Sequence, residues 1–161
     1  MNISMRVLAF GMLLLCAIVA IANDVKELYW EDMVPQDYSA PSQEYAVTHE
    51  GAAGLQTDAA APVVESLNGQ HVKIPGFVVP LDASGETVKE FLLVPYFGAC
   101  VHVPPPPSNQ IVHVTLEKPV PMDDVYDAVW IEGVLNTETW EGDLAVVGYR
   151  MKGLSVSPFE G

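Results

Sequence analysis

The chain has 161 residues, and its 21 acidic and seven basic side chains give it a net charge of −14. Nucleic acids and anionic membrane surfaces attract basic patches, so this acidity argues against both as partners. It favours cations or a basic partner, although most of these carboxylates are explained by a solvated acidic surface.

The first 22 residues have the pattern of a signal peptide. Arg6 precedes an almost wholly apolar run over residues 8–21, and Ala20 and Ala22 are small residues three and one before a cut after Ala22. We expect cleavage there and export to the periplasm. A lipoprotein anchor at Cys16 is disfavoured because no small residue precedes it. A retained span is disfavoured because the apolar run is shorter than roughly 20 residues, so the protein is not expected to span a membrane.

Two segments without a clear apolar period follow the signal peptide. Residues 27–35 (ELYWEDMVP) place two aromatic side chains beside a small acidic group, and Pro35 ends any helix there. We interpret residues 23–35 as an N-terminal docking segment. Residues 36–62 are rich in Ala, Gly, Ser, Gln and Pro, a composition that predicts a flexible linker.

Residues 63–161 are predicted to form one small β domain. Short β-branched runs, separated by Pro and Gly, predict five or six strands at 72–81, 90–96, 110–116, 128–135 and 144–159. Turn formers at 82–86 and 136–143 predict antiparallel neighbours, and residues 120–129 predict a helical turn or short helix. The fold class expected is all-β, a small OB-like barrel of five to six strands with one short helix.

A cysteine and a histidine stand two apart before four prolines, in residues 97–107 (FGACVHVPPPP). Pro95 and Pro104 restrict the residues before them to extended geometry, so Val94 to Val103 is expected to be extended. Cys100 and His102 would then share one face and could bind one ion. Zinc matches these ligands, with copper(I) as the alternative, and His113 on the next strand is the candidate third ligand.

The same cysteine has two other interpretations. Cys16 leaves with the signal peptide, so Cys100 has no disulfide partner and is equally explained as a small buried apolar group. It could also be the nucleophile of a thiol enzyme with His102 as base, but no third orienting group is identifiable. Phosphate loops, nucleophile elbows and zinc-protease motifs are missing from the sequence, so no enzyme is expected.

Several segments together resemble the DUF3299 family of exported bacterial proteins. They are GFVVPLD (76–82), FLLVPYFGACVHVPPPPSNQIV (91–112), VWIEGVL (129–135), GYRMKGLSVSPF (148–159) and the opening YWEDMVP (29–35). The family's shared positions correspond here to Cys100, His102, the prolines 104–107, Asn109 and Gln110, whereas His113 is not part of that pattern. The resemblance implies a gene neighbourhood with ABC transporter components, sometimes within zinc-responsive gene sets.

Three functions are therefore in competition. The first is a periplasmic metal-binding accessory protein, for zinc, beside an ABC transporter, in which Asn109 and Gln110 hydrogen-bond the ligands or else cap the proline turn. The second is a non-enzymatic module that docks a membrane complex or other envelope protein, and the third is the thiol enzyme. The docking face expected for the second consists of Tyr96, Phe97, Pro104, Pro105, Pro106 and Pro107.

Overall fold

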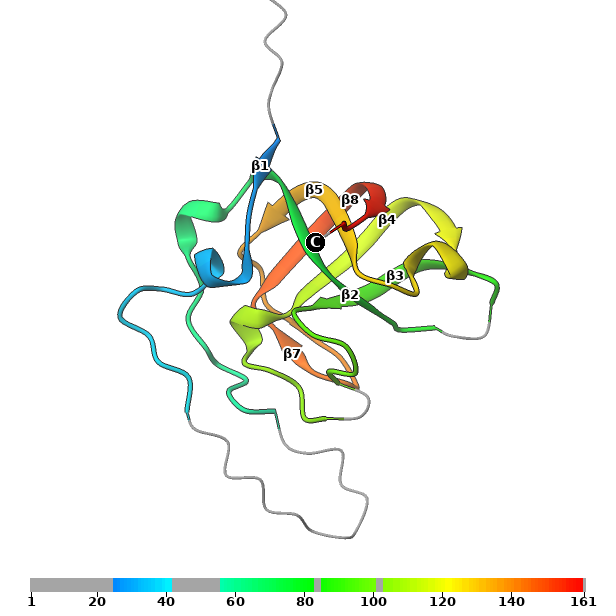
Figure 1. The fold of residues 1–161 in the computed structure, drawn as a ribbon. Coiled ribbons are helices and arrows are strands. Elements are labelled where there is room, and N and C mark those ends of the chain that lie inside the picture. The colour runs from blue at the N-terminus through cyan, green and yellow to red at the C-terminus, as the bar shows by residue number, and fades with distance from the viewer. Residues whose placement is uncertain (1–24, 42–55, 83–84, 101–102, 161) are drawn as a thin grey trace, which may run out of the picture.

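The computed structural model describes residues 25–41, 56–82, 85–100 and 103–160, and the predicted signal peptide lies outside them. The described chain is almost entirely β-structure with short 3-10 turns, as expected (Figure 1). The strands are β1 Lys26–Glu27, β2 Gln70–Pro80, β3 Thr87–Val94, β4 Val112–Pro121, β5 Val129–Asn136, β6 Trp140–Glu141, β7 Val146–Val147 and β8 Tyr149–Pro158. The 3-10 turns are η1 Trp30–Met33, η2 Glu65–Leu67, η3 Ser108–Gln110 and η4 Met122–Val125.

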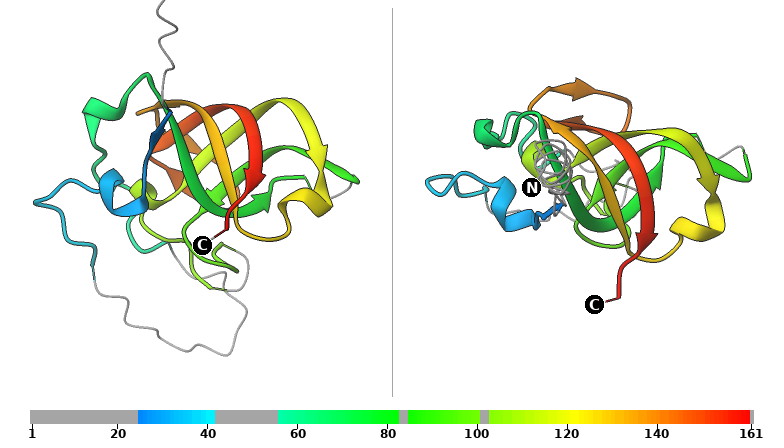
Figure 2. Two further views of the ribbon diagram at one scale, coloured as in Figure 1. Left: turned by 45° about the horizontal axis from the view of Figure 1, so that its top comes forward. Right: turned by 90° about the horizontal axis from the view of Figure 1, so that it is seen from above.

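Five strands close into a barrel in the order β2-β3-β4-β8-β5, with β5 returning to β2. The pair β4–β8 is parallel and the other pairs in the barrel are antiparallel. Closure depends on the long strand β2, because residues 70–76 pair with β5 while residues 77–80 pair with β3. Figure 2 shows the resulting closed wall of strands. This is the strand order of an OB-type barrel, so the predicted fold class is confirmed.

The barrel interior is filled by alternate residues of each strand. Along β5, for example, buried and partly buried positions alternate from Val129 to Asn136, so that Val129, Ile131 and Leu135 face the core. Fully burying an aliphatic side chain of this size contributes about 1.5–3 kcal/mol. The short turn η4, in the region predicted to be helical, adds Val125 to the same core.

A second apolar layer lies outside the barrel against β3 and β4. Phe91 and Leu93 belong to the interior cluster, whereas the intervening Leu92 and the following Val94 belong to the outer one. The hairpin β6–β7 and the loop after β3 cover this outer layer. It contains Val79, Leu92, Val94, Ala99, Cys100, Ile111, Ala145 and Val147, with Trp140 packed against it.

The predicted strand over 144–159 is divided into β7 and β8 at Gly148. The Gly148 N–H donates to the Ser108 carbonyl at 2.8 Å, and a Cβ at this position would lie 2.7 Å from Val63 Cγ1. The chain therefore leaves the covering hairpin and enters the barrel wall at a glycine where a larger residue would require Val63 to shift. Within the described ranges, no helix is both long and apolar enough to cross a bilayer.

The N-terminal arm, which we define as residues 25–41, packs along the barrel. Strand β1 runs parallel to β2, and Leu28 and Met33 are fully buried in the barrel's core cluster. The Trp30 indole N–H donates to the Pro75 carbonyl at 2.7 Å. Residues 25–35 of the predicted docking segment therefore pack against the barrel of the same chain.

Of the predicted linker, residues 42–55 lie outside the described residues, while residues 56–62 are bonded to the proline run. The Thr57 N–H donates to the Pro105 carbonyl at 3.3 Å, and the Ser108 N–H donates to the Asp58 carbonyl at 2.8 Å. Gln56 joins the proline run to the hairpin, because its Nε2 donates to the carbonyls of Pro106 and Val146 at 3.0 and 2.7 Å.

Gly133→Ala is expected to destabilise the barrel. A Cβ at position 133 would overlap the Lys152 carbonyl oxygen, at the irregularity where β5 and β8 pair. Relieving that overlap requires a backbone shift, which costs about 1–3 kcal/mol. Urea denaturation measures the loss, and Gly85→Ala is the matched control because its Cβ would meet nothing closer than 3.6 Å. Equal stability of both variants would contradict this account of the closure.

Candidate binding site

Cys100 does not lie on an extended strand, so that expectation was wrong. Strand β3 ends at Val94, and Cys100 has a φ of +65°, in the left-handed region. Between them the chain turns back, with the Ala99 N–H donating to the Tyr96 carbonyl at 3.4 Å and the Val103 N–H donating to the Gly98 carbonyl at 3.3 Å. A proline restricts only the residue before it, and the turn at Gly98 reverses the chain.

The Cys100 thiol is buried in the outer apolar layer, where the residue is 8 % exposed. Burial raises its pKa to about 11, so the thiol is protonated at neutral pH. Metal binding and nucleophilic attack both require the thiolate, which this environment disfavours. His102, the predicted neighbouring ligand, lies outside the described residues.

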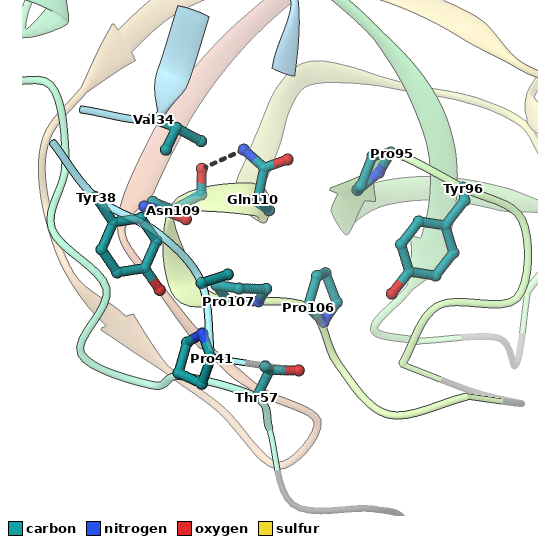
Figure 3. A pocket seen from close by; sticks show the side chains of 11 residues that line it. Val34, Tyr38, Pro41, Thr57, Pro95, Tyr96, Pro106, Pro107, Asn109 and Gln110 are labelled. Atoms are coloured by element: carbon teal, nitrogen blue, oxygen red, sulfur yellow. Dashed lines mark hydrogen bonds between the residues drawn. The ribbon is translucent and has the colours of Figure 1, made fainter. Parts of the chain in front are cut away.

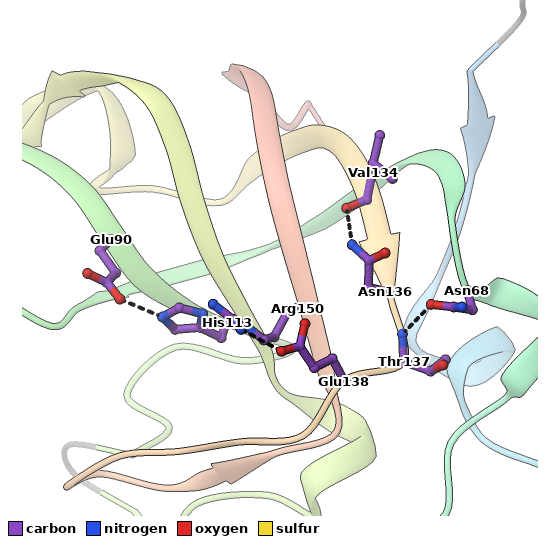
Figure 4. Close-up of polar contacts among 8 residues, drawn as sticks. All are labelled: Asn68, Glu90, His113, Val134, Asn136, Thr137, Glu138 and Arg150. Atoms are coloured by element: carbon purple, nitrogen blue, oxygen red, sulfur yellow. Dashed lines mark hydrogen bonds and ion pairs between the residues drawn. The ribbon is translucent and has the colours of Figure 1, made fainter.

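His113 on β4 is buried, with 1 % exposure, and its ring has partners on its edge and on its face. Its Nε2 bonds Glu90 Oε1 at 2.8 Å (Figure 4). The ring stacks on Trp140 with centroids 4.3 Å apart. Burial lowers the pKa of His113, and the bond to Glu90 acts in the opposite sense. The imidazole thereby joins the covering hairpin to the barrel wall.

The metal site stays a prediction. In the described part of the chain, no three side chains of His, Cys, Asp or Glu come together as a metal site. Coordination of zinc or copper(I) by Cys100, His102 and His113 depends on a residue that is not described.

Asn109 and Gln110 fasten two outer segments to the barrel. Both lie in η3. Asn109 Nδ2 donates to the Pro62 carbonyl at 2.8 Å, and Gln110 Nε2 donates to the carbonyls of Trp30 and Asn109 at 2.9 and 3.2 Å. Their amide nitrogens thus bond main-chain carbonyls. Two of these, of Pro62 and Trp30, are distant in the sequence, and the third, of Asn109, is in η3 itself.

A third fastening, which sequence reasoning missed, is the buried hydroxyl of Tyr149 at the start of β8. It accepts a hydrogen bond from the Val64 N–H at 2.7 Å and donates one to the Met33 carbonyl at 2.8 Å. A tyrosine in a strand pattern indicates burial of the ring but gives no signal for the partners of its hydroxyl.

These fastenings form a groove with a volume of about 350 Å³ between the arm, residue Thr57 and the proline run (Figure 3). The arm supplies one wall, and the loop from Pro95 to Gln110 supplies the other. The lining residues are Val34, Tyr38, Ala40, Pro41, Thr57, Pro95, Tyr96, Pro106, Pro107, Asn109 and Gln110.

One polar atom of the groove lining lacks a partner. Asn109 is fully buried, and its Oδ1 has no hydrogen-bond partner within the described ranges. The orientation of the amide is fixed because the Pro62 carbonyl can only accept, so the nitrogen must face Pro62. A buried carbonyl oxygen of this kind requires a donor from water or from a ligand.

The predicted docking face is only partly the groove. Tyr96, Pro106 and Pro107 line it, whereas Pro104 and Pro105 do not. Phe97 is also outside the lining: it is 66 % exposed and packs edge-to-face on Phe77 at 5.9 Å. The arm residues of the lining were missed, because apolar residues scattered in a low-complexity segment show no period.

A closed OB-type barrel carrying an arm and a proline-walled groove defines the class of this protein. The model of the DUF3299 family, described as a protein of unknown function, matches residues 30–158, and the chain belongs to that family. A crystal structure of a DUF3299 family protein from Pseudomonas aeruginosa PAO1 is similar, with 43 % identity and a TM-score of 0.73 over 85 % of this chain and 97 % of that one. A search of curated proteins finds no match.

Cys100 is expected to react slowly with iodoacetamide in the native protein. With a pKa raised to about 11 from 9.0, the thiolate fraction near pH 8 falls by about 100-fold relative to an ordinary thiol. The rate should therefore rise with pH up to about 11 in the folded chain, but level off near 9 in urea. Mass spectrometry on the Cys16→Ser chain measures the alkylation rate of Cys100 in the folded protein and in urea. A native rate equal to the urea rate at pH 8 would show a reactive thiol.

Tyr149→Phe is expected to loosen the arm and the segment at Val64 together. The change leaves the Val64 N–H and the Met33 carbonyl without their hydroxyl partner, and each unpaired buried group costs about 1–3 kcal/mol. Urea denaturation measures the loss, and hydrogen exchange should show faster exchange at Val64. Tyr126→Phe is the control because Tyr126 is 76 % exposed. Unchanged exchange at Val64 would contradict the proposed fastening.

Proposed function

We propose that this protein is a non-enzymatic binding module that docks an extended polypeptide segment of another protein in the groove. The observation that carries the proposal is a groove walled by proline and tyrosine whose lining includes Asn109, a residue with a buried Oδ1 that has no partner among the described residues. Pockets that bind a ligand combine mainly apolar walls with a few polar groups that fix its orientation. Grooves lined with aromatic residues are a recurring way to bind extended segments.

The lining suits a polypeptide because it is rigid before the ligand arrives. Four of the eleven lining residues are prolines, whose ring fixes the backbone φ angle. Tyr38 and Tyr96 add large contact surfaces that have few rotatable bonds, so ordering them on binding costs little entropy. An extended polypeptide segment offers N–H donors, on its backbone or its side chains, that could bond Asn109 Oδ1.

The chemistry of the lining favours binding over catalysis. Its titratable side chains are the two tyrosines, and the pKa of Tyr38 is raised to about 12 by burial and by its hydrogen bond to Asp58. General acid–base catalysis near neutral pH needs a group with a pKa near the working pH, and none of the lining side chains is of that kind. The thiol enzyme is also not favoured, because Cys100 is buried and protonated at neutral pH.

We further propose that the partner is an envelope protein met in the periplasm. The signal-peptide pattern of residues 1–22 supports export, and the family resemblance makes a component of an ABC transporter the first candidate. Metal binding at Cys100, His102 and His113 is the weaker candidate, because no described contact favours it over the buried-thiol interpretation.

Filling the groove is expected to abolish peptide binding. Dodecapeptides are selected from a phage-displayed library on the full chain, and the dissociation constant of the enriched peptide is measured by fluorescence polarisation. Ala40 is exposed on the groove lining, so Ala40→Trp should occupy the groove without disturbing the core. Binding should weaken at least about tenfold, or 1.4 kcal/mol.

Ala60→Trp is the matched control, because Ala60 is equally exposed but lines a different hollow beside Val63 and Gly148. It should bind the peptide as the unaltered chain does. Equal loss in both variants would mean that the peptide binds elsewhere, and failure to enrich any peptide would count against the proposed function itself.

A further inference from the structure

We infer that the ligand presents a cationic hydrogen-bond donor to the groove, the guanidinium of an arginine or the ammonium of a lysine in an extended segment. The inference rests on the proposed function and specifies its partner. It follows from three independent properties of the groove: the hydrogen-bond donors that its lining lacks, the charge around it, and its aromatic surface.

The lining is poor in hydrogen-bond donors. Pro41, Pro95, Pro106 and Pro107 have no backbone N–H. A ligand that lies along these residues meets carbonyl groups and ring carbons, and the walls cannot donate to an anionic or acceptor-rich ligand at these four positions.

The side-chain donors of Tyr38, Thr57, Asn109 and Gln110 are engaged within the protein. The Tyr38 hydroxyl donates to Asp58 Oδ2 at 2.9 Å, and the Thr57 hydroxyl donates to the Pro105 carbonyl at 3.3 Å. The amide nitrogens of Asn109 and Gln110 donate to main-chain carbonyls, whereas Asn109 Oδ1 accepts no hydrogen bond from any residue that the structure describes. The groove therefore needs a ligand that donates.

The charge around the groove has one sign. Glu31, Asp32 and Asp37 stand exposed on the arm, and Asp58 follows the lining residue Thr57. Residues 28–41, 56–72 and 95–111, which contain the groove lining, include no lysine or arginine. Lys26 on β1 and Lys73 on β2 lie next to these segments, and Lys73 Nζ is paired with Glu27 at 2.9 Å. A cation is attracted to such a surface and an anion is repelled, with a range set by the ionic strength.

Aromatic rings favour the same kind of ligand. Tyr38 and Tyr96 lie on the two sides of the groove, on the arm and on the loop after β3 (Figure 3). The face of a tyrosine ring attracts a guanidinium or ammonium group within about 6 Å. Arginine combines this attraction with several N–H donors in one plane, so it meets all three requirements together.

Three mixtures of synthetic decapeptides test the inference on the full chain. Eight positions are randomised over uncharged residues including proline, and the two central positions are arginine, citrulline or glutamate. Citrulline keeps the shape and most N–H donors of arginine without the charge. In low salt the arginine mixture should bind about tenfold tighter than the citrulline mixture, and the glutamate mixture should be weakest. The preference for arginine should shrink in 0.5 M salt.

Substitutions of carboxylates test whether the preference for arginine arises at the groove. Asp37→Asn with Asp58→Asn removes two charges beside Tyr38, while the amide at position 58 still bonds the tyrosine hydroxyl. This variant should lose most of the preference for arginine over citrulline. Asp123→Asn with Asp124→Asn removes two charges in η4 and should retain the preference. Thermal melting of each variant verifies that the fold is intact.

The outcomes separate this inference from the proposed function. If all three mixtures bind equally and Ala40→Trp still abolishes binding, the groove docks peptides but the cationic requirement is wrong. If the η4 control loses the preference as fully as the groove variant, the charge effect belongs to the whole molecule and the inference is also overturned. If no mixture binds and phage selection also fails, the proposed function is overturned with it.

Discussion

The buried side chain of Tyr149 makes two hydrogen bonds through its hydroxyl, and the placement of both outer segments depends on them. It holds Met33 of the arm on one side and Val64 on the other, while its ring fills the barrel core. Asn109 and Gln110 also bond these two segments, because Asn109 donates to the Pro62 carbonyl and Gln110 donates to the Trp30 carbonyl. The strands alone would close without these bonds, but the groove would lose one of its walls.

That dependence gives the groove an unusual composition. Its walls are main chain, proline rings and two tyrosines. The amide nitrogens of Asn109 and Gln110 bond main-chain carbonyls, and the buried Asn109 Oδ1 has no partner among the described residues. The groove-lining segments, residues 28–41, 56–72 and 95–111, also carry carboxylates but no lysine or arginine. A recognition surface results in which the ligand has to supply the donors and the positive charge.

The barrel was predictable from the sequence, but the groove was not. Alternation along 128–135 or 110–116 is a local property, and short connections limit which strands can be neighbours, so the OB-like barrel followed from these runs. The extended path through Cys100 was wrong, because the restriction by Pro95 reaches only one residue and the turn at Gly98 outweighs it. Tyr38 and Pro41 had no pattern to reveal them, since they lie in a segment without an apolar period, and the Tyr38 hydroxyl bonds the carboxylate of Asp58, which is distant in the sequence.

The outer layer over β3 and β4 has a consequence for comparisons across folds. In many OB barrels the exposed face of the second and third strands is where oligonucleotides or oligosaccharides lie. In this barrel the corresponding strands are β3 and β4, and that face is occupied by its own hairpin, with Trp140 stacked on His113. A ligand transferred by superposing a nucleic-acid-binding barrel would overlap Trp140. The barrel fold alone therefore does not indicate which ligand this protein binds.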